Sequence, residues 1–134
     1  VRHAVGDVTG DGVDDLITAA GVGGAPHVKV YDGATGAVRR DFFAYDPGFT
    51  GGVELAVGDV NRDGRDDIIV GAGPGGGPHV RAFDALSGGL LTEFLAFESG
   101  FRGGVFVASG DLDVDGYDDV IVGAGAGGGP RVVA

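Results

Sequence analysis

A direct internal repeat constrains this chain more than any other feature of its sequence. Shifting the sequence by 52 residues aligns it with itself without a gap, and 26 of the first 52 residues are identical to the residue 52 positions later. A third copy begins at residue 105 and runs to residue 134. Such a period is typical of proteins in which one supersecondary unit packs against copies of itself. We therefore expect three units, 1–52, 53–104 and 105–134.

Within each unit the apolar residues have the spacing of β-strands. Short β-branched runs alternate with turns rich in Gly, Pro and Asp, and no segment of helical length is free of glycine. In the second unit this pattern predicts strands at 53–58, 67–72, 79–84 and 90–97. The run 68–70 is apolar on successive residues, which predicts that this second strand is covered on both faces and is more buried than the third.

Four short antiparallel strands per unit are typical of β-propeller blades, whose faces are covered by the neighbouring blades. The sequence therefore predicts an all-β fold of antiparallel four-stranded blades, about two and a half of them in this chain. Closed propellers contain at least about four blades, so partners would complete the ring or the chain would be part of a longer array. The third unit ends before its fourth strand, and an uncovered strand edge favours pairing with another chain.

Composition excludes several classes of function. The chain has no Cys, which rules out disulfides and thiolate metal sites. Its formal net charge is −11 with only nine Lys and Arg, so it lacks the basic surface that nucleic-acid binding requires. The longest apolar runs are far shorter than a bilayer crossing, and no membrane span is expected.

The acidic residues are concentrated in three nine-residue loops. Thirteen of the 20 Asp and Glu lie at 7–15, 59–67 and 111–119. Carboxylates at alternate positions repel one another unless a cation lies between them, and oxygen ligands at positions 1, 3 and 5 suit a hard divalent ion. Gly at position 6 permits the turn that directs the carbonyl of position 7 to the metal, as in an EF-hand loop. Position 12 holds no Glu, so the Asp at position 9 must complete the ligand shell.

Each loop thus predicts one Ca²⁺ ion, three in all, because Mg²⁺ demands tighter octahedral geometry than these flexible loops offer. The side chains of the position 8 aspartates are expected to turn away from the metal. They would either face solvent or contact the metal ligands without binding the ion themselves. Since Thr9 can offer only a neutral hydroxyl, the first site should be weaker than the third. An acidic hairpin turn that uses Asp and Gly only for their conformations is the alternative. The predicted ligands are Asp7, Thr9, Asp11, Val13 and Asp15; Asp59, Asn61, Asp63, Arg65 and Asp67; and Asp111, Asp113, Asp115, Tyr117 and Asp119.

Residues 57–72 read VGDVNRDGRDDIIVGA, and residues 5–20 and 109–124 match this segment with small changes. The segment resembles the core signature of the FG-GAP repeat, also called VCBS-type, of calcium-binding β-propellers, and the resemblance extends over the whole chain. It implies calcium between the first two strands of each blade, held by loop positions 1, 3, 5, 7 and 9, with Thr9 as the main departure. Members of this family act in integrin-like adhesion, in fungal sugar-binding lectins and as repeats of large secreted bacterial proteins.

Other motifs are better explained by structure than by chemistry. The Gly-rich segments at 21–26, 73–78 and 125–130 precede strands and lack the Lys of a phosphate-binding loop, so they are expected to be turns. His27 and His79 are equivalent, but Arg131 replaces them in the third unit, which favours packing or hydrogen bonding over catalysis. No Ser has a repeated His partner, and an enzyme is not expected. The aromatic residues are expected in the core or between blades, with sugar-stacking surfaces as the alternative: Phe42, Phe43, Tyr45, Phe49, Phe94, Phe97, Phe101 and Phe106.

Together these features predict a non-enzymatic, calcium-stabilised structural or adhesion scaffold that is extracellular, either secreted or on the cell surface. It would assemble through blade-to-blade contacts with further copies, into a ring or a filament, or with adjoining repeats of a longer chain. Two alternatives remain open. The first is a carbohydrate-binding propeller of the lectin type, whose partners are glycans. The second is a non-catalytic repeat domain of a secreted enzyme.

Overall fold

The computed structural model describes residues 2–21, 23, 26–45, 49, 51–63, 65–73, 75, 79–84, 89–96, 102–110, 114, 118–125 and 132–133. All regular structure in this part of the chain is β-strand. Among these residues no helix has the length and apolarity that a bilayer crossing requires.

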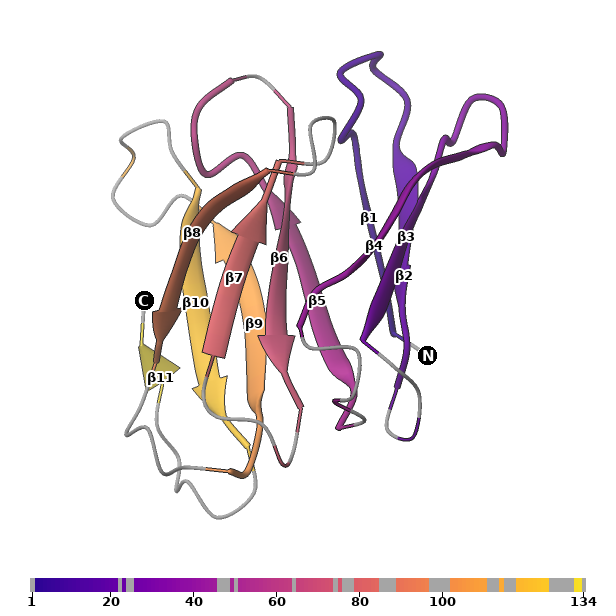
Figure 1. Ribbon diagram of the computed structural model, residues 1–134. Coiled ribbons are helices and arrows are strands. Elements are labelled where there is room, and N and C mark those ends of the chain that lie inside the picture. Colours follow the sequence, from indigo (N-terminus) through magenta and orange to yellow (C-terminus); the bar gives the residue numbers. More distant parts are fainter. Residues whose placement is uncertain are drawn as a thin grey trace.

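The strands form three antiparallel sheets in chain order, and we call these sheets the first, second and third blade (Figure 1). In the two four-stranded sheets each strand pairs with the next one along the chain, whereas the third sheet has three strands in the order β11-β10-β9. The all-β fold of propeller-type blades is therefore confirmed. The strands are β1 (Arg2–Gly6), β2 (Asp15–Ala19), β3 (His27–Tyr31) and β4 (Val38–Phe43); β5 (Val53–Gly58), β6 (Asp67–Ala72), β7 (His79–Phe83) and β8 (Leu90–Leu95); and β9 (Val105–Gly110), β10 (Asp119–Ala124) and β11 (Val132–Val133).

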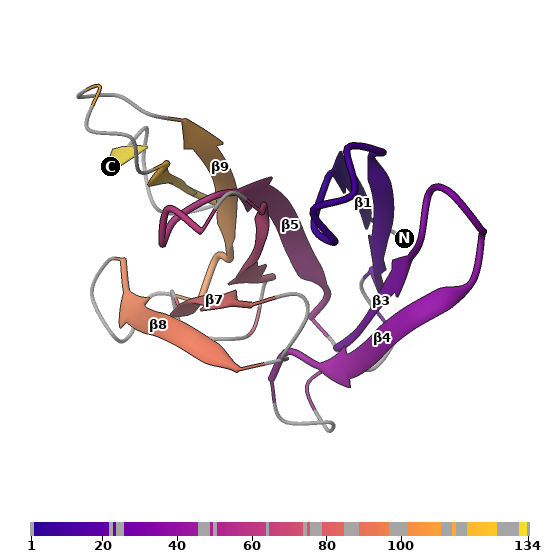
Figure 2. The same cartoon turned by 90° about the horizontal axis from the view of Figure 1, so that it is seen from above.

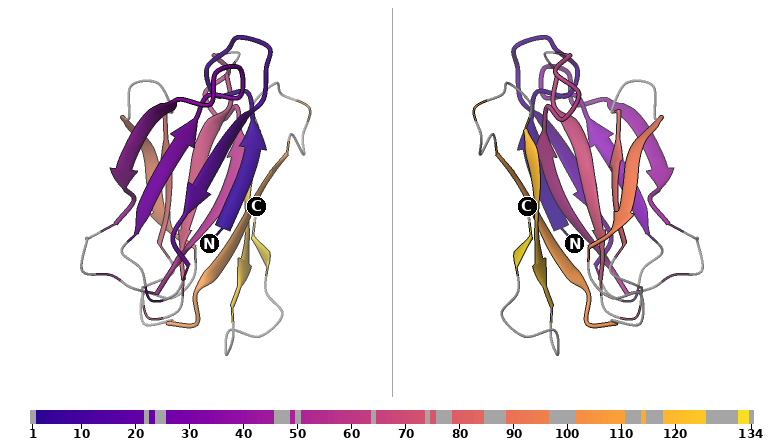
Figure 3. Two further views of the ribbon diagram at one scale, coloured as in Figure 1. Left: turned by 90° about the vertical axis from the view of Figure 1, so that its right-hand side faces the viewer. Right: turned by 90° about the vertical axis from the view of Figure 1, so that its left-hand side faces the viewer.

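The blades stand side by side with β1, β5 and β9 adjacent, whereas β4 and β8 lie away from this row (Figure 2). Seen from either side, the strands of all blades run roughly along one direction, so the connecting loops gather at two ends of the molecule (Figure 3). This arrangement brings equivalent loops of consecutive blades next to one another.

The predicted strand positions in the second blade are confirmed closely. β5 and β6 begin and end where expected, whereas β7 ends at Phe83 and β8 at Leu95, one and two residues earlier than predicted. The backbone explains the first difference, because the N–H of Asp84 donates to the carbonyl of Gly89 at 2.9 Å and closes the turn instead of extending the strand.

The core lies between the blades. Successive side chains of a strand point to opposite faces, and β6 accordingly packs Ile68 and Val70 against the first blade and Ile69 against the third. Every residue of β6 is buried, whereas β7 alternates in part, as the sequence predicts. The buried residues between the first and second blades are Val8, Ile17, Ala19, Val28, Val30, Ala44, Val53, Ile68, Val70 and Phe83, and those between the second and third are Ile69, Val80, Ala82, Val105 and Val122.

Tyr45 makes polar contacts from the first blade into the second. Its hydroxyl donates to the carbonyl of His79 at 2.7 Å and lies 3.2 Å from the carbonyl of Val70. The Arg81 guanidinium lies 5.3 Å from the Tyr45 ring centroid and donates to the carbonyl of Ala44 at 2.8 Å. Burial raises the pKa of Tyr45 above its usual value, so the phenol stays neutral and remains a hydrogen-bond donor.

The expectation for the aromatic residues is only partly correct. Phe42 packs against Phe83 across the joint, with ring centroids 4.9 Å apart. In contrast, Phe43, Phe94 and Phe106 are 49%, 37% and 56% exposed, so the prediction that they are packed is wrong. Phe43 and Phe94 lie on the outlying strands β4 and β8, and Phe106 lies on β9 of the third blade. Phe97 and Phe101 lie outside the described residues.

Candidate metal centres

The first two acidic loops connect β1 to β2 and β5 to β6, and they lie next to each other at one end of the molecule (Figure 1). Closely spaced Asp and Gly residues favour a tight loop between paired strands. Asp side chains accept hydrogen bonds from nearby backbone N–H groups, and Gly adopts left-handed dihedral angles without strain. Gly12, at loop position 6, has φ +83° as this argument requires.

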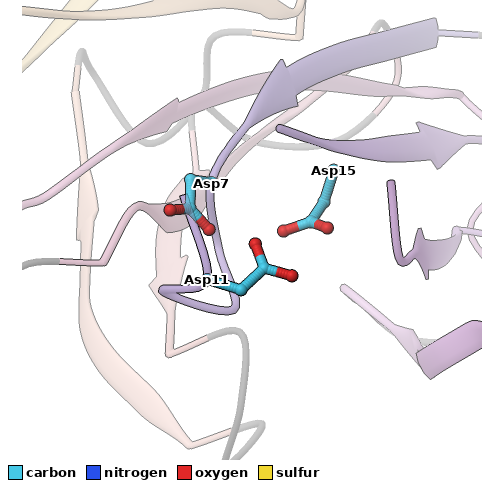
Figure 4. A group of neighbouring side chains, drawn as sticks. All are labelled: Asp7, Asp11 and Asp15. Atoms are coloured by element: carbon cyan, nitrogen blue, oxygen red, sulfur yellow. The ribbon is translucent and has the colours of Figure 1, made fainter. Parts of the chain in front are cut away.

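In each of these loops three carboxylates converge. Asp7, Asp11 and Asp15 each offer an oxygen atom, and these atoms all lie within 4.8 Å of one another (Figure 4). Asp59, Asp63 and Asp67 form the same group in the second loop. The structure thus brings together the predicted ligands at loop positions 1, 5 and 9.

Backbone N–H groups hold the first carboxylate of the first loop. Asp7 accepts hydrogen bonds from the N–H groups of Gly10 and Gly12, both at 2.8 Å. The hydrogen bond from Gly12 is the main reason that the pKa of Asp7 lies below its ordinary value. Asp11 accepts the N–H of Val13 at 2.9 Å. Asp7 is therefore an anion at neutral pH, and hydrogen bonds from the loop backbone fix the orientation of its carboxylate.

The carboxylate at position 9 is both buried and anchored. Asp15 is 1% exposed; its Oδ2 accepts the N–H groups of Val8 and Thr9 at 3.0 and 3.2 Å, and its Oδ1 accepts that of Gly33 at 2.8 Å. Asp67 is equally buried and accepts the N–H of Val60 at 3.0 Å.

The pKa of Asp67 is raised to about 7, mainly by burial and in smaller part by the nearby carboxylates of Asp63, Asp59 and Asp84. A divalent cation among these groups would supply the opposite charge that they lack. The donor set fits such an ion, because it consists only of oxygen atoms, as Ca²⁺ prefers.

The remaining predicted ligands lie in the loops but outside these carboxylate groups. The Thr9 hydroxyl lies 3.5 Å from Asp7 Oδ1, and Asn61 Oδ1 accepts the N–H of Asp63 at 3.3 Å. At position 7, the N–H groups of Val13 and Arg65 donate to the position 5 carboxylate, each at 2.9 Å. In the third loop Asp119 begins β10, whereas Asp111, Asp113, Asp115 and Tyr117 lie outside the described residues.

The second loop contains a cation of its own, the guanidinium of Arg65, which the loop pattern did not predict. Arg65 was expected to contribute only its carbonyl, yet its Nη2 lies 3.2 Å from Asp63 Oδ2 and 3.9 Å from Asp84 Oδ2. The first loop has Val13 at the same position. A metal ion in the second loop would therefore compete with a guanidinium for Asp63, which would not happen in the first.

The expectation for position 8 is only partly correct, because in the described joints these aspartates turn away from their own loop but contact the preceding loop. The N–H of Asp66 donates to the carbonyl of Asp7 at 3.0 Å, and that of Asp118 donates to the carbonyl of Asp59 at 2.9 Å. Because the loops stand side by side, a residue that points away from its own loop points to the preceding one. Asp14 has no preceding loop in this chain and is exposed.

Loop position 4 has a left-handed backbone in all three loops. The φ angles are +82° at Gly10, +61° at Arg62 and +60° at Val114. Only Gly10 signals this conformation in the sequence, since Arg and Val rarely adopt it. The left-handed backbone at Arg62 and Val114 could therefore not be predicted from the sequence.

Comparisons with known proteins agree with the resemblance read from the sequence. The FG-GAP repeat profile matches residues 51–83. The chain is 35% identical over 153 residues to integrin alpha pat-2 of Caenorhabditis briggsae, covering 90% of this chain and 12% of the relative. It is 32% identical over 142 residues to integrin alpha-V of Gallus gallus, covering 93% of this chain and 14% of the relative. The chain thus spans only a small part of the length of these curated relatives.

Proposed function

Because this chain contains an FG-GAP repeat and resembles integrin alpha subunits over nine-tenths of its length, we propose that it is a non-enzymatic, extracellular adhesion-type scaffold stabilised by calcium. The observation that carries the proposal is the convergence of three carboxylates in each of two consecutive loops, directly beside the joint between two blades. The integrin names belong to the relatives, and the adhesion role is extended to this chain as part of the proposal.

In this proposal each unit, 1–52, 53–104 and 105–134, is one blade and holds one Ca²⁺ ion. Carboxylates at positions 1, 5 and 9 provide the charge, and the side chain at position 3 and the carbonyl at position 7 complete the shell. The bound ion would supply positive charge to a loop that otherwise concentrates carboxylates. Millimolar extracellular calcium would fill sites of modest affinity, and binding to the folded chain alone would stabilise it.

Assembly through the blade faces is the second part of the proposal. Val5 and Leu16 are 54% and 40% exposed on the first blade. Their equivalents, Val57 and Ile68, pack against the first blade within the core between the first two blades. A further blade of the same kind, from a second copy or from adjoining repeats, would cover Val5 and Leu16 in the same way. Such a heterologous contact yields a ring if it closes and a filament if it does not.

A calcium titration of the chelated chain, followed by circular dichroism and light scattering, tests both parts. Calcium stabilisation predicts a rise in β-structure or in thermal stability, and assembly predicts a rise in particle mass with protein concentration. If calcium stabilises the chain while the mass stays that of a monomer, only the assembly part fails. If no metal binds and neither quantity changes, the calcium part fails.

One observation favours the lectin alternative. Phe43 is 49% exposed, its ring lies 5.2 Å from the His27 ring, and His27 Nε2 lies 3.8 Å from Asp41. An exposed aromatic ring with polar neighbours is the kind of surface on which a sugar stacks. The second blade has Leu95 at the position of Phe43, so this surface is not repeated. Glycan-array binding that Phe43→Ala abolishes would support the lectin role, and its absence would favour the scaffold.

A further inference from the structure

The second acidic loop is held by a residue of the following blade. The N–H of Asp118 donates to the carbonyl of Asp59 at 2.9 Å, and the Asp118 carboxylate accepts the N–H of Asp59 at 3.0 Å. Both main-chain polar groups of Asp59, the first predicted ligand of its loop, are thereby bonded to one residue. Asp118 is the position 8 aspartate of the third loop, a position that the proposed calcium shell does not use.

The joint between the first two blades has a related arrangement. Asp66 donates its N–H to the carbonyl of Asp7 at 3.0 Å. A Cβ atom at Gly6 would lie only 2.5 Å from Asp66 Oδ2, and one at Gly10 only 2.9 Å from Arg65 Cγ. Positions 7 and 8 of the second loop therefore both lie against the first loop.

The glycine before each loop marks where this contact occurs. A Cβ atom at Gly58 would lie 2.7 Å from Ser109 Oγ and 2.8 Å from Asp118 Oδ2. At Gly110, the same position in the last blade, the described part of the chain places no atom within 4 Å of an added Cβ. Among the described residues, the backbone is thus closely approached at Gly6 and Gly58, the two positions that another blade of this chain follows.

We infer that the position 8 aspartate is a positioning residue that couples the metal loop of one blade to the packing of the next blade. This inference rests on the calcium function proposed above. By linkage, a contact that holds the loop in the arrangement the ion requires raises the affinity for Ca²⁺, and the ion strengthens the contact by the same factor. Each ion then stabilises the joint with the blade that follows it. Asp14 is the position 8 aspartate of the first blade and is exposed. If another copy packed against this blade, Asp14 would contact the last acidic loop of that copy as Asp118 contacts the second loop.

Calcium titrations followed by the backbone amide resonances of the full chain test the coupling. The amide of Asp63 reports on the second loop and that of Gly12 on the first. We expect Asp118→Ala to weaken calcium binding at the Asp63 reporter about fivefold or more, with no change at Gly12. Asp118→Asn keeps an oxygen that can accept the N–H of Asp59, so it should restore most of the affinity. Asp14→Ala removes the same charge at the first loop, away from Asp59, and should leave the Asp63 reporter unchanged.

Equal losses at Asp63 in Asp118→Ala and Asp118→Asn would overturn the inference, because charge alone would then explain the effect. No loss in Asp118→Ala, or an equal loss at both reporters, would also overturn it. If Asp118→Ala does not fold, Gly58→Ala displaces the Asp118 carboxylate instead, and Gly110→Ala is its matched control. Wild-type reporters that do not respond to calcium would refute the calcium function itself, whereas calcium binding that is insensitive to Asp118 would refute only the coupling.

Discussion

At the scale of single residues, the spacing of the acidic loops was enough to predict which carboxylates lie close together. In the first two loops the carboxylates at positions 1, 5 and 9 converge as expected, because the Asp and Gly residues of the loop determine the turn. Two features could not be predicted from the spacing. The left-handed conformation at position 4 is imposed on Arg62 and Val114 by the loop, against their own preference. The contact made by Asp66 and Asp118 lies between units, and a pattern within one unit does not show it.

Val114 provides a stability test of the strained position. It is 87% exposed and has φ +60°, and a left-handed backbone costs a residue with a Cβ about 1–2 kcal/mol. Val114→Gly should therefore raise the free energy of unfolding by roughly 0.5–1 kcal/mol, since glycine relieves this strain but gains entropy in the unfolded chain. Gly10→Val makes the reverse change in the first loop and should destabilise. Chemical denaturation measures both, and a less stable Val114→Gly protein would contradict the account.

At the scale of strands, the sequence predicted the position and burial of β6 because its apolar run has no polar face. The polar contacts across the joint between the first two blades could not be predicted in the same way. Tyr45 has Phe97 as its equivalent in the second unit, so the repeat suggested an aromatic packing residue and gave no sign of a hydroxyl bonded to two backbone carbonyls.

Tyr45→Phe tests this contact. The ring should still fit, because the second unit has Phe at the same place, but the partly buried carbonyl of His79 loses its hydroxyl donor. We expect a loss of about 0.5–1.5 kcal/mol in the free energy of unfolding. Tyr31→Phe is the control, because within the described residues the Tyr31 hydroxyl makes no hydrogen bond. Urea denaturation compares the two variants, and equal effects would show that the Tyr45 hydroxyl does not stabilise the joint.

His79 predicts a pH dependence of the same joint. Burial lowers its pKa, with a further contribution from Arg81, and Glu93 opposes the shift. Because the folded-state pKa is depressed, the unfolded chain takes up the proton first, so the stability due to neutral His79 is present above about pH 6.5 and is lost as the pH falls below it. The free energy of unfolding of wild-type protein should therefore decrease more than that of His79→Gln between about pH 7.5 and pH 5. Parallel decreases would show that His79 does not contribute.

At the scale of the whole molecule, the repeat made the fold class predictable, since a unit with two apolar faces requires a neighbour on each side. The first blade accordingly exposes Val5 and Leu16, whose equivalents in the second blade pack between blades. The exposure of Phe43 and Phe94 was not predicted, because their sequence pattern does not reveal that β4 and β8 lie away from the row of inner strands.

The exposed face of the first blade leads to a prediction about assembly. Val5→Glu with Leu16→Glu places two charges where a further blade would pack, and should return the chain to its monomeric mass. Leu90→Glu with Leu91→Glu adds the same charge on the exposed strand β8 and serves as the control. Sedimentation velocity over a range of protein concentrations measures the mass. If the β8 variant dissociates equally, or neither variant does, the blade face is not the contact.

The most direct test of the calcium scaffold is the number of calcium ions that the chelated, full chain binds, measured by equilibrium dialysis. Our account predicts three ions per chain, filled at or below the millimolar concentrations typical of extracellular sites, about 10⁻⁴–10⁻³ M. Binding of less than one ion per chain at about 10 mM, an order of magnitude above that range, would contradict it, because the acidic loops would then be turns and nothing more.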